Sequence, residues 1–128
     1  MKVNVLIDSY GWIEYFGDGP LAESYGRYIE KADKKGYYTP TIVLYEVYKK
    51  MKSELSEDKA LEAYAYISAY TTVVSLDERL ALEAAERSLS HGLPMADAII
   101  AATAKAFEAK IVTGDPHFKG LENAEIIK

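Results

Sequence analysis

Val3-Asn4-Val5-Leu6-Ile7-Asp8-Ser9, residues 3–9, opens with a short apolar run that ends abruptly at a carboxylate. Branched side chains dominate residues 3–7, and a run of this length and composition predicts a buried β-strand. A carboxylate taken into apolar surroundings is costly unless a partner compensates for its charge. The stretch therefore predicts a strand inside the protein and a charged group at its end that needs a partner.

Three further acidic residues lie in similarly apolar parts of the sequence. Glu46 directly follows residues 42–45, Asp97 precedes residues 98–100, and Asp115 follows residues 111–114. A divalent cation is one counter-charge that could serve all of these carboxylates together. Because the chain has no Cys, the available ligands are carboxylates and two histidines, and hard oxygen ligands favour Mg²⁺ or Mn²⁺.

The rest of the chain alternates short apolar strands with amphipathic helices. Strands are predicted at residues 3–7, 37–39, 72–75, 110–113 and 124–127. Helical segments are predicted at residues 12–16, capped by Asp8 or Ser9, and at residues 21–35, 41–52, 57–69, 76–90 and 95–109. This alternation predicts the α/β class, with a parallel sheet covered by helices on both faces.

The positions of the acids within these elements suggest a single site. Asp8 and Asp115 each lie just beyond a predicted strand, and Glu46 and Asp97 lie near the starts of predicted helices. In open parallel sheets, ligands bind beyond the carboxyl ends of the strands. We therefore expect the four acids to meet at one edge of the sheet.

Composition limits the class of protein. The 128 residues suit one domain, residues 1–128, with 49% hydrophobic and 27% charged residues. No apolar run approaches the ~20 residues that span a membrane, and the N-terminal apolar stretch is too short for a signal peptide, so a cytoplasmic protein is expected. A net charge of −5 argues against nucleic-acid binding driven by bulk charge, but it is compatible with a nuclease.

Four pieces of sequence, taken in order, resemble the PIN domain family. They are Leu6-Ile7-Asp8-Ser9, a mid-chain Glu46 in a helix that begins with Thr-Pro, Leu93-Pro94-Met95-Ala96-Asp97-Ala98, and Thr113-Gly114-Asp115-Pro116-His117-Phe118. The size and layout look most like the VapC toxins of bacterial and archaeal toxin–antitoxin pairs. The resemblance implies a three-layer α/β/α domain with a small central parallel sheet. It also implies a metal-dependent ribonuclease, usually a homodimer, that cleaves RNA and is held inactive by a cognate antitoxin.

The resemblance also assigns roles to particular residues. The acidic centre of the family matches Asp8, Glu46, Asp97 and Asp115, and its supporting hydroxyl positions match Ser9 and Thr113. Mg²⁺ or Mn²⁺ at such a centre orients and deprotonates water and neutralises charge on the phosphodiester. Asp8 and Asp97 are expected to be the closest metal ligands, with Asp115 and Glu46 completing the site directly or through water.

Each of these residues also has a purely structural interpretation. Asp8 could cap a helix, Asp97 could complement a helix dipole, and Asp115 could set the turn before a proline. Glu46 could face solvent. His117 could touch a phosphate, but a surface histidine in a turn is the simpler interpretation.

Other functions remain alternatives. A haloacid-dehalogenase-like phosphatase also begins with a strand and an aspartate, but it needs a second aspartate where this chain has Tyr10. A response-regulator receiver is disfavoured because no adjacent acidic pair precedes the first helix. Within the PIN resemblance, a housekeeping RNA-processing nuclease and a catalytically inactive binding module both stay open.

Overall fold

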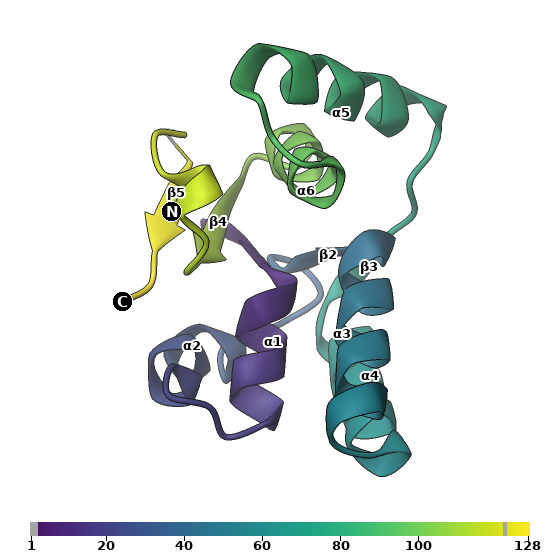
Figure 1. Cartoon of the computed structure of the whole chain (residues 1–128), viewed down its shortest axis with the longest axis vertical. Helices are drawn as coiled ribbons and strands as arrows, with labels where there is room; N and C mark the ends of the chain where they lie inside the picture. Colours follow the sequence, from purple (N-terminus) through teal and green to yellow (C-terminus); the bar gives the residue numbers. More distant parts are fainter. Residues whose placement is uncertain (1–2, 122) are drawn as a thin grey trace.

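Strands and helices alternate along nearly the whole chain in a computed structural model, which describes residues 3–121 and 123–128 (Figure 1). In chain order the elements are β1 (Asn4–Ile7), α1 (Ser9–Phe16), α2 (Ala22–Ile29), β2 (Tyr38–Pro40), α3 (Thr41–Glu54), α4 (Glu57–Tyr70), β3 (Thr72–Val74), α5 (Glu78–His91), α6 (Met95–Ala106), β4 (Ala109–Thr113), the short 3₁₀ helix η1 (Pro116–Phe118) and β5 (Ala124–Ile126). Apart from the first predicted helical segment and the ends of two helices, these bounds lie within two residues of the predicted ones.

All strand pairs are parallel. β1 pairs with β4, β4 pairs with β5, and β2 pairs with β3. A bridge between Val5 and Tyr37 joins the two groups, which gives the strand order β3-β2-β1-β4-β5. Because the strands are parallel, Ile7 lies opposite Val112 and the carboxyl ends of β1 and β4 reach the same edge.

Helices cover both faces of the strands, which confirms the predicted three-layer α/β/α architecture. In Figure 1, α5 and α6 lie above the strands, and α1 to α4 lie below them. α6 contacts β4 and β2 from one side, while α1 contacts β4 and α3 contacts β2 from the other. The largest side chains buried between these layers are aliphatic or aromatic, among them Leu6, Ile7, Trp12, Tyr25, Ile100 and Ile111.

The helix predicted at residues 21–35 is shorter than expected and ends at Ile29. Its last carbonyls are satisfied by side chains from other elements, so no further helical turn is needed there. The Tyr37 hydroxyl donates to the Tyr28 carbonyl at 2.6 Å, and the Tyr66 hydroxyl donates to the Ile29 carbonyl at 2.8 Å. Ala32 still keeps the helical spacing beyond this point, but the chain turns toward β2.

The helix predicted at residues 95–109 was also too long, because α6 ends at Ala106 and Ala109 already belongs to β4. Glu108 adopts a positive φ of 51°, which reverses the chain. Phe107 stacks on the ring of Tyr38 with centroids 4.5 Å apart, and its carbonyl accepts from the Asn4 side chain at 2.8 Å. These contacts hold the reversal against the sheet. No helix among the described residues is both long and apolar enough to cross a membrane.

Candidate metal centre

Asp8 is buried at the junction between β1 and α1, with only 3% of its surface exposed. One carboxylate oxygen, Oδ1, accepts from the Gly11 amide at 2.8 Å, so Asp8 is the N-cap of α1. The other oxygen, Oδ2, accepts from the Thr113 hydroxyl at 2.6 Å. Helix capping is therefore part of the role of Asp8, and the same carboxylate also reaches the neighbouring strand β4.

Thr113 connects Asp8 to the segment that follows β4. Its hydroxyl oxygen accepts from the Asp115 amide at 2.9 Å and, as a donor, binds Asp8. Thr113 is fully buried, so its side chain has little freedom to leave these two hydrogen bonds. Ser9 lies half-buried at the start of α1, and in the described part of the chain its hydroxyl makes no hydrogen bond to the acids.

A group of potential metal ligands lies where α6 begins and β4 ends. Asp97 lies in the first turn of α6, after the N-cap Pro94. Asp115 caps η1 by accepting from the His117 amide at 2.9 Å. The His117 Nδ1 atom lies 3.2 Å from Asp97 Oδ2 and 2.9 Å from Asp115 Oδ1. One potential ligand atom from each of these residues lies within 4.8 Å of the others.

Burial and mutual repulsion perturb the acids of this centre. Burial raises the pKa of Asp8 to about 6, against the opposing effect of the Thr113 and Gly11 hydrogen bonds. Burial, and then the charge of Asp115, raises the pKa of Asp97 to about 6, while His117 opposes this shift. The charge of Asp115 raises the pKa of both Asp8 and Asp97, so the two carboxyls share one electrostatic neighbour.

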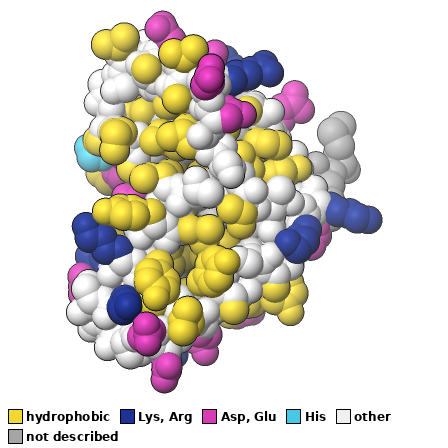
Figure 2. Space-filling model, turned by 90° about the vertical axis from the view of Figure 1, so that its right-hand side faces the viewer, with side chains coloured by type: hydrophobic (Ala, Val, Ile, Leu, Met, Phe, Trp, Pro, Cys, Tyr) yellow, Lys and Arg dark blue, Asp and Glu magenta, His cyan; other side chains and the backbone are white. Residues whose placement is uncertain are grey.

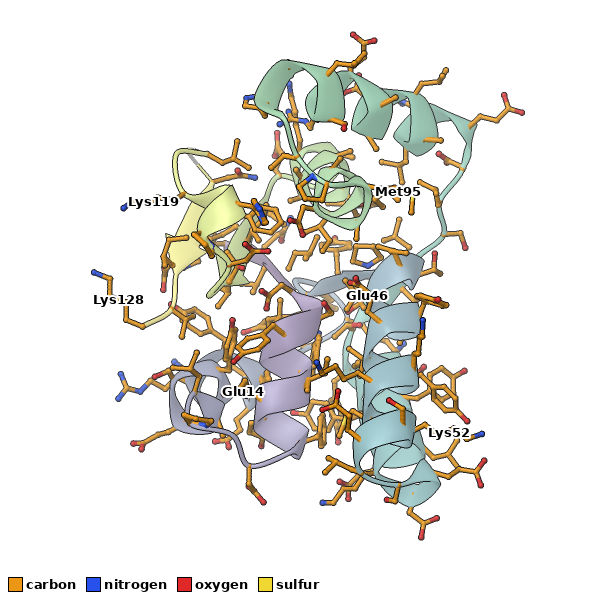
Figure 3. All side chains as sticks on the ribbon, viewed as in Figure 1. Glu14, Glu46, Lys52, Met95, Lys119 and Lys128 are labelled. Atoms are coloured by element: carbon orange, nitrogen blue, oxygen red, sulfur yellow. The ribbon has the colours of Figure 1, made fainter. Side chains whose placement is uncertain are left out.

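Glu46 approaches the same group from α3. Its side chain is half-buried in the second turn of that helix, and its charge adds to the rise in the pKa of Asp97. Figure 3 shows Glu46 on α3, between that helix and α6. Glu46 therefore faces the site.

Two residues near the acids were not assigned to the site from the sequence. His117 is exposed, as the simpler interpretation expects, but its ring also lies between two of the acids. The separation of only two positions from Asp115, across a proline, is the signal that could have suggested it. Tyr25 was counted among the apolar face of a helix, yet its hydroxyl lies beside Asp8, and no sequence pattern indicates this.

The residues present fit a divalent cation. Asp97 and Asp115 supply hard carboxylate oxygens and His117 supplies a nitrogen, all within the spacing of a single ion. The pKa values of Asp8 and Asp97 are raised mainly by burial and further by the charge of Asp115, so the ionised carboxylates lack a counter-charge here. A bound cation would supply that counter-charge, and solvent can reach the centre through the half-buried side chains of Asp97 and Asp115.

Comparison with known proteins gives matches at the level of family and fold. A comparison with curated proteins finds none that matches the chain. A toxin–antitoxin complex from Klebsiella pneumoniae is 20% identical with a TM-score of 0.78, over 95% of this chain and 96% of that chain. The Sarcin-Ricin loop cleaving toxin VapC20 of Mycobacterium tuberculosis is 16% identical with a TM-score of 0.80, over 98% and 100%. VapBC2 from Rickettsia felis, bound to a promoter DNA fragment, is 18% identical with a TM-score of 0.74, over 98% and 100%.

These likenesses show a shared fold, and the match to the family rests on the sequence itself. The model of the PIN domain family matches residues 5–123. That range contains Asp8 after β1, Glu46 on α3, Asp97 on α6 and the segment with Asp115. The chain belongs to the PIN domain family.

Proposed function

We propose that residues 1–128 act as one nuclease domain, an Mg²⁺- or Mn²⁺-dependent endoribonuclease that serves as the toxin of a VapBC-type toxin–antitoxin pair. The observation that supports this most is the convergence of Asp97 and Asp115 at one edge of the sheet, with Asp8 joined to the Asp115 backbone amide through Thr113. Membership of the PIN domain family supports the same conclusion. An RNA substrate would place the activity in the cytoplasm.

Each residue of the centre has a distinct part in this proposal. Asp97 and Asp115 would hold the cation, with Asp8 and Glu46 completing its surroundings directly or through water. When bound, the cation supplies charge neutralisation at the phosphodiester and activation of the attacking water. Thr113 keeps the Asp8 carboxylate in one orientation through the 2.6 Å hydrogen bond. Ser9 lies close enough in sequence to Asp8 to support it once substrate is present.

The toxin role implies a protein partner as well as RNA. Similar structures include toxin–antitoxin complexes, which supports a cognate antitoxin for this chain. Figure 2 shows hydrophobic side chains gathered on one face of the molecule. Exposed hydrophobic residues of the elements on that side include Tyr70, Val73, Leu76 and Met95. An apolar surface of this kind suits a protein partner, either the antitoxin or a second copy in a homodimer.

Cleavage of a labelled RNA panel tests the ribonuclease proposal. The wild-type chain should cleave RNA when Mg²⁺ or Mn²⁺ is present, and cleavage should stop when the cation is chelated. Asp8→Asn should lower the rate by roughly 100-fold or more, because one charge of the centre is lost. Asp77→Asn is the matched control, since Asp77 caps α5 by accepting from the Leu80 amide at 2.9 Å and Asn can cap equally well.

The outcomes separate the enzyme from an inactive binding module. Cleavage that survives in Asp77→Asn and disappears in Asp8→Asn supports the enzyme. Equal cleavage by wild type and Asp8→Asn would point to a contaminating nuclease, and no cleavage by wild type would favour the binding module.

Controlled expression in cells tests the toxin role separately. Expression of the wild-type chain should slow growth, and Asp8→Asn should not. Normal growth despite expression of a chain that cleaves RNA in vitro would contradict the toxin role, and a housekeeping RNA-processing nuclease would then be the better interpretation.

A further inference from the structure

Tyr25 occupies a space beside the acidic centre that two glycines leave open. Its ring, on α2, is fully buried. A Cβ at Gly11 would lie 2.4 Å from Tyr25 Cε1, and a Cβ at Gly114 would lie 3.3 Å from the Tyr25 hydroxyl oxygen. Gly11 follows Asp8 by three positions and Gly114 directly precedes Asp115. The ring therefore enters between the two segments that hold these acids.

The hydroxyl at the end of this ring has no hydrogen-bond partner of good geometry among the described residues. Leaving a buried donor unpaired destabilises the folded chain, and phenylalanine would fill the same space without that cost. The polar groups nearest to the hydroxyl are the Asp8 carboxyl and the backbone at Gly114. The hydroxyl is thus placed beside the carboxylate of the proposed metal centre, which is a strong acceptor.

The hydrogen bonds already made by Asp8 leave a place for this donor. A carboxylate offers about four acceptor positions on its two oxygens. The Gly11 amide occupies a position on Oδ1 and the Thr113 hydroxyl occupies one on Oδ2. A third donor would leave one acceptor position of the Asp8 carboxylate free. Asp8 could then bind a cation through that one lone pair and from one direction only.

We propose that Tyr25 is a positioning residue that donates a hydrogen bond to the ionised Asp8 carboxylate and orients it toward the bound cation. The inference rests on the proposed metal-dependent function and adds a residue to it. Tyr25 acts through Asp8 and does not touch RNA or the cation. Hydrogen-bonding partners of metal ligands typically change metal affinity by about 10–100-fold when they are removed.

Tyr25→Phe tests this role, because it removes one oxygen and leaves the ring. Mn²⁺ affinity measured by calorimetry and by electron paramagnetic resonance should fall by roughly tenfold. The metal-free chain should also lose some thermal stability, because the hydrogen bond to the ionised Asp8 carboxylate is lost. Gly114→Ala, which crowds the same hydroxyl without removing it, should weaken Mn²⁺ binding in the same direction.

Tyr37→Phe is the matched control. Tyr37 is also a buried tyrosine, but its hydroxyl donates to the Tyr28 carbonyl at 2.6 Å and serves the end of α2. This variant should lose thermal stability and keep the Mn²⁺ affinity of the wild type. A purely structural role for Tyr25 would give the same pattern as Tyr37.

The possible results separate this inference from the proposed function. If the wild type binds Mn²⁺ and Tyr25→Phe binds it equally well, the positioning role is wrong and the metal centre stands. If the wild type binds no Mn²⁺ at millimolar concentration, the metal centre and the role of Tyr25 fall together.

Discussion

Asp8 has an observed structural role and a proposed chemical one. Its carboxylate caps α1 through the Gly11 amide and is tied to β4 through Thr113. Both contacts fix the side chain, and neither removes the cost of burying the charge, since the pKa of Asp8 still rises to about 6. The helix cap and the proposed metal site are therefore two uses of the same oriented carboxylate.

This raised pKa predicts how stability depends on pH in the absence of metal. Between the ordinary aspartate pKa near 4 and about 6, the folded chain keeps a proton on Asp8 that the unfolded chain has released. The free energy of unfolding should therefore fall as pH rises from about 4 to about 7, by roughly 2–3 kcal/mol from this carboxyl. Urea unfolding with a chelator across this range measures the effect.

Asp8→Asn isolates that contribution. Asparagine still accepts from the Gly11 amide but does not titrate, so the fall in stability should be smaller in the variant. The pKa of Asp97 is also raised, so the free energy of unfolding of Asp8→Asn should still fall somewhat as pH rises. Identical pH profiles for the two chains would show that Asp8 ionises as it does in the unfolded state.

His117 predicts a preference between metals. Its Nδ1 atom lies between Asp97 and Asp115, and imidazole nitrogen suits Mn²⁺ better than Mg²⁺, which prefers oxygen ligands. His117→Ala should lower Mn²⁺ affinity by roughly three- to tenfold and change Mg²⁺ affinity by less than about twofold. Calorimetric titration with each metal gives the ratio of the two affinities.

His91→Ala serves as the control for this measurement, because His91 is exposed at the end of α5 and contacts the Ser90 hydroxyl. Both affinities should match those of the wild type in that variant. Loss of Mg²⁺ and Mn²⁺ binding to the same extent in His117→Ala would indicate that the imidazole organises Asp115 instead of binding metal.

At the scale of elements, α1 is built around the close approach of Tyr25. Gly→Ala normally stabilises the interior of a helix by about 1 kcal/mol. At Gly11 the new methyl group would lie 2.4 Å from the Tyr25 ring and 2.7 Å from Ile7 Cγ2, so one of these groups must move. Gly11→Ala should therefore destabilise the chain by roughly 1–3 kcal/mol in urea unfolding, in spite of the better helix propensity.

Gly26→Ala provides a comparison within α2. Its Cβ would meet no atom closer than 3.2 Å, from the edge of the Tyr15 ring, so a small adjustment is enough. This variant should lie within about 1 kcal/mol of the wild type, because the gain in helix propensity offsets the tight contact. Equal stability of both variants would show that α1 shifts freely away from α2.

The ends of α2 and α6 show the limit of periodicity as a signal. Ala32 keeps the helical spacing after α2, no glycine or proline intervenes before Gly36, and Phe107 and Ala109 follow α6, so the sequence predicts longer helices. Tyr37 and Tyr66 supply hydroxyls to the last carbonyls of α2, and Phe107 stacks on Tyr38 after α6. Tyr66 and Tyr38 lie far along the chain from the helix ends that they help to fix, so local sequence does not reveal where the helices stop.

At the scale of the whole molecule, a bound cation would hold three separate parts of the chain together. Asp8 follows β1, Asp97 begins α6 and Asp115 follows β4, all at one edge of the sheet. Mg²⁺ should therefore slow amide hydrogen exchange at the ends of β1 and β4 and at the start of α6. The turn between α3 and α4 lies at the far end of the molecule in Figure 1 and should not change.

Hydrogen exchange with mass spectrometry, with and without Mg²⁺, checks this prediction. Asp97→Asn should remove most of the protection, because it weakens the cation site without changing the layers of the fold. Uniform protection over the whole chain would contradict a local site and would indicate a general gain in stability.

The sequence by itself determined the α/β class, the order of the elements and the four acids. Buried strands, amphipathic helices and acidic residues within apolar stretches each have a recognisable local pattern of side chains. Only the tertiary structure decided which acid lies next to which, the bridging position of His117 and the approach of Tyr25 to Asp8. These depend on contacts between segments up to about a hundred positions apart, formed when the strands pair and the helices pack on both faces, and local spacing does not record such contacts.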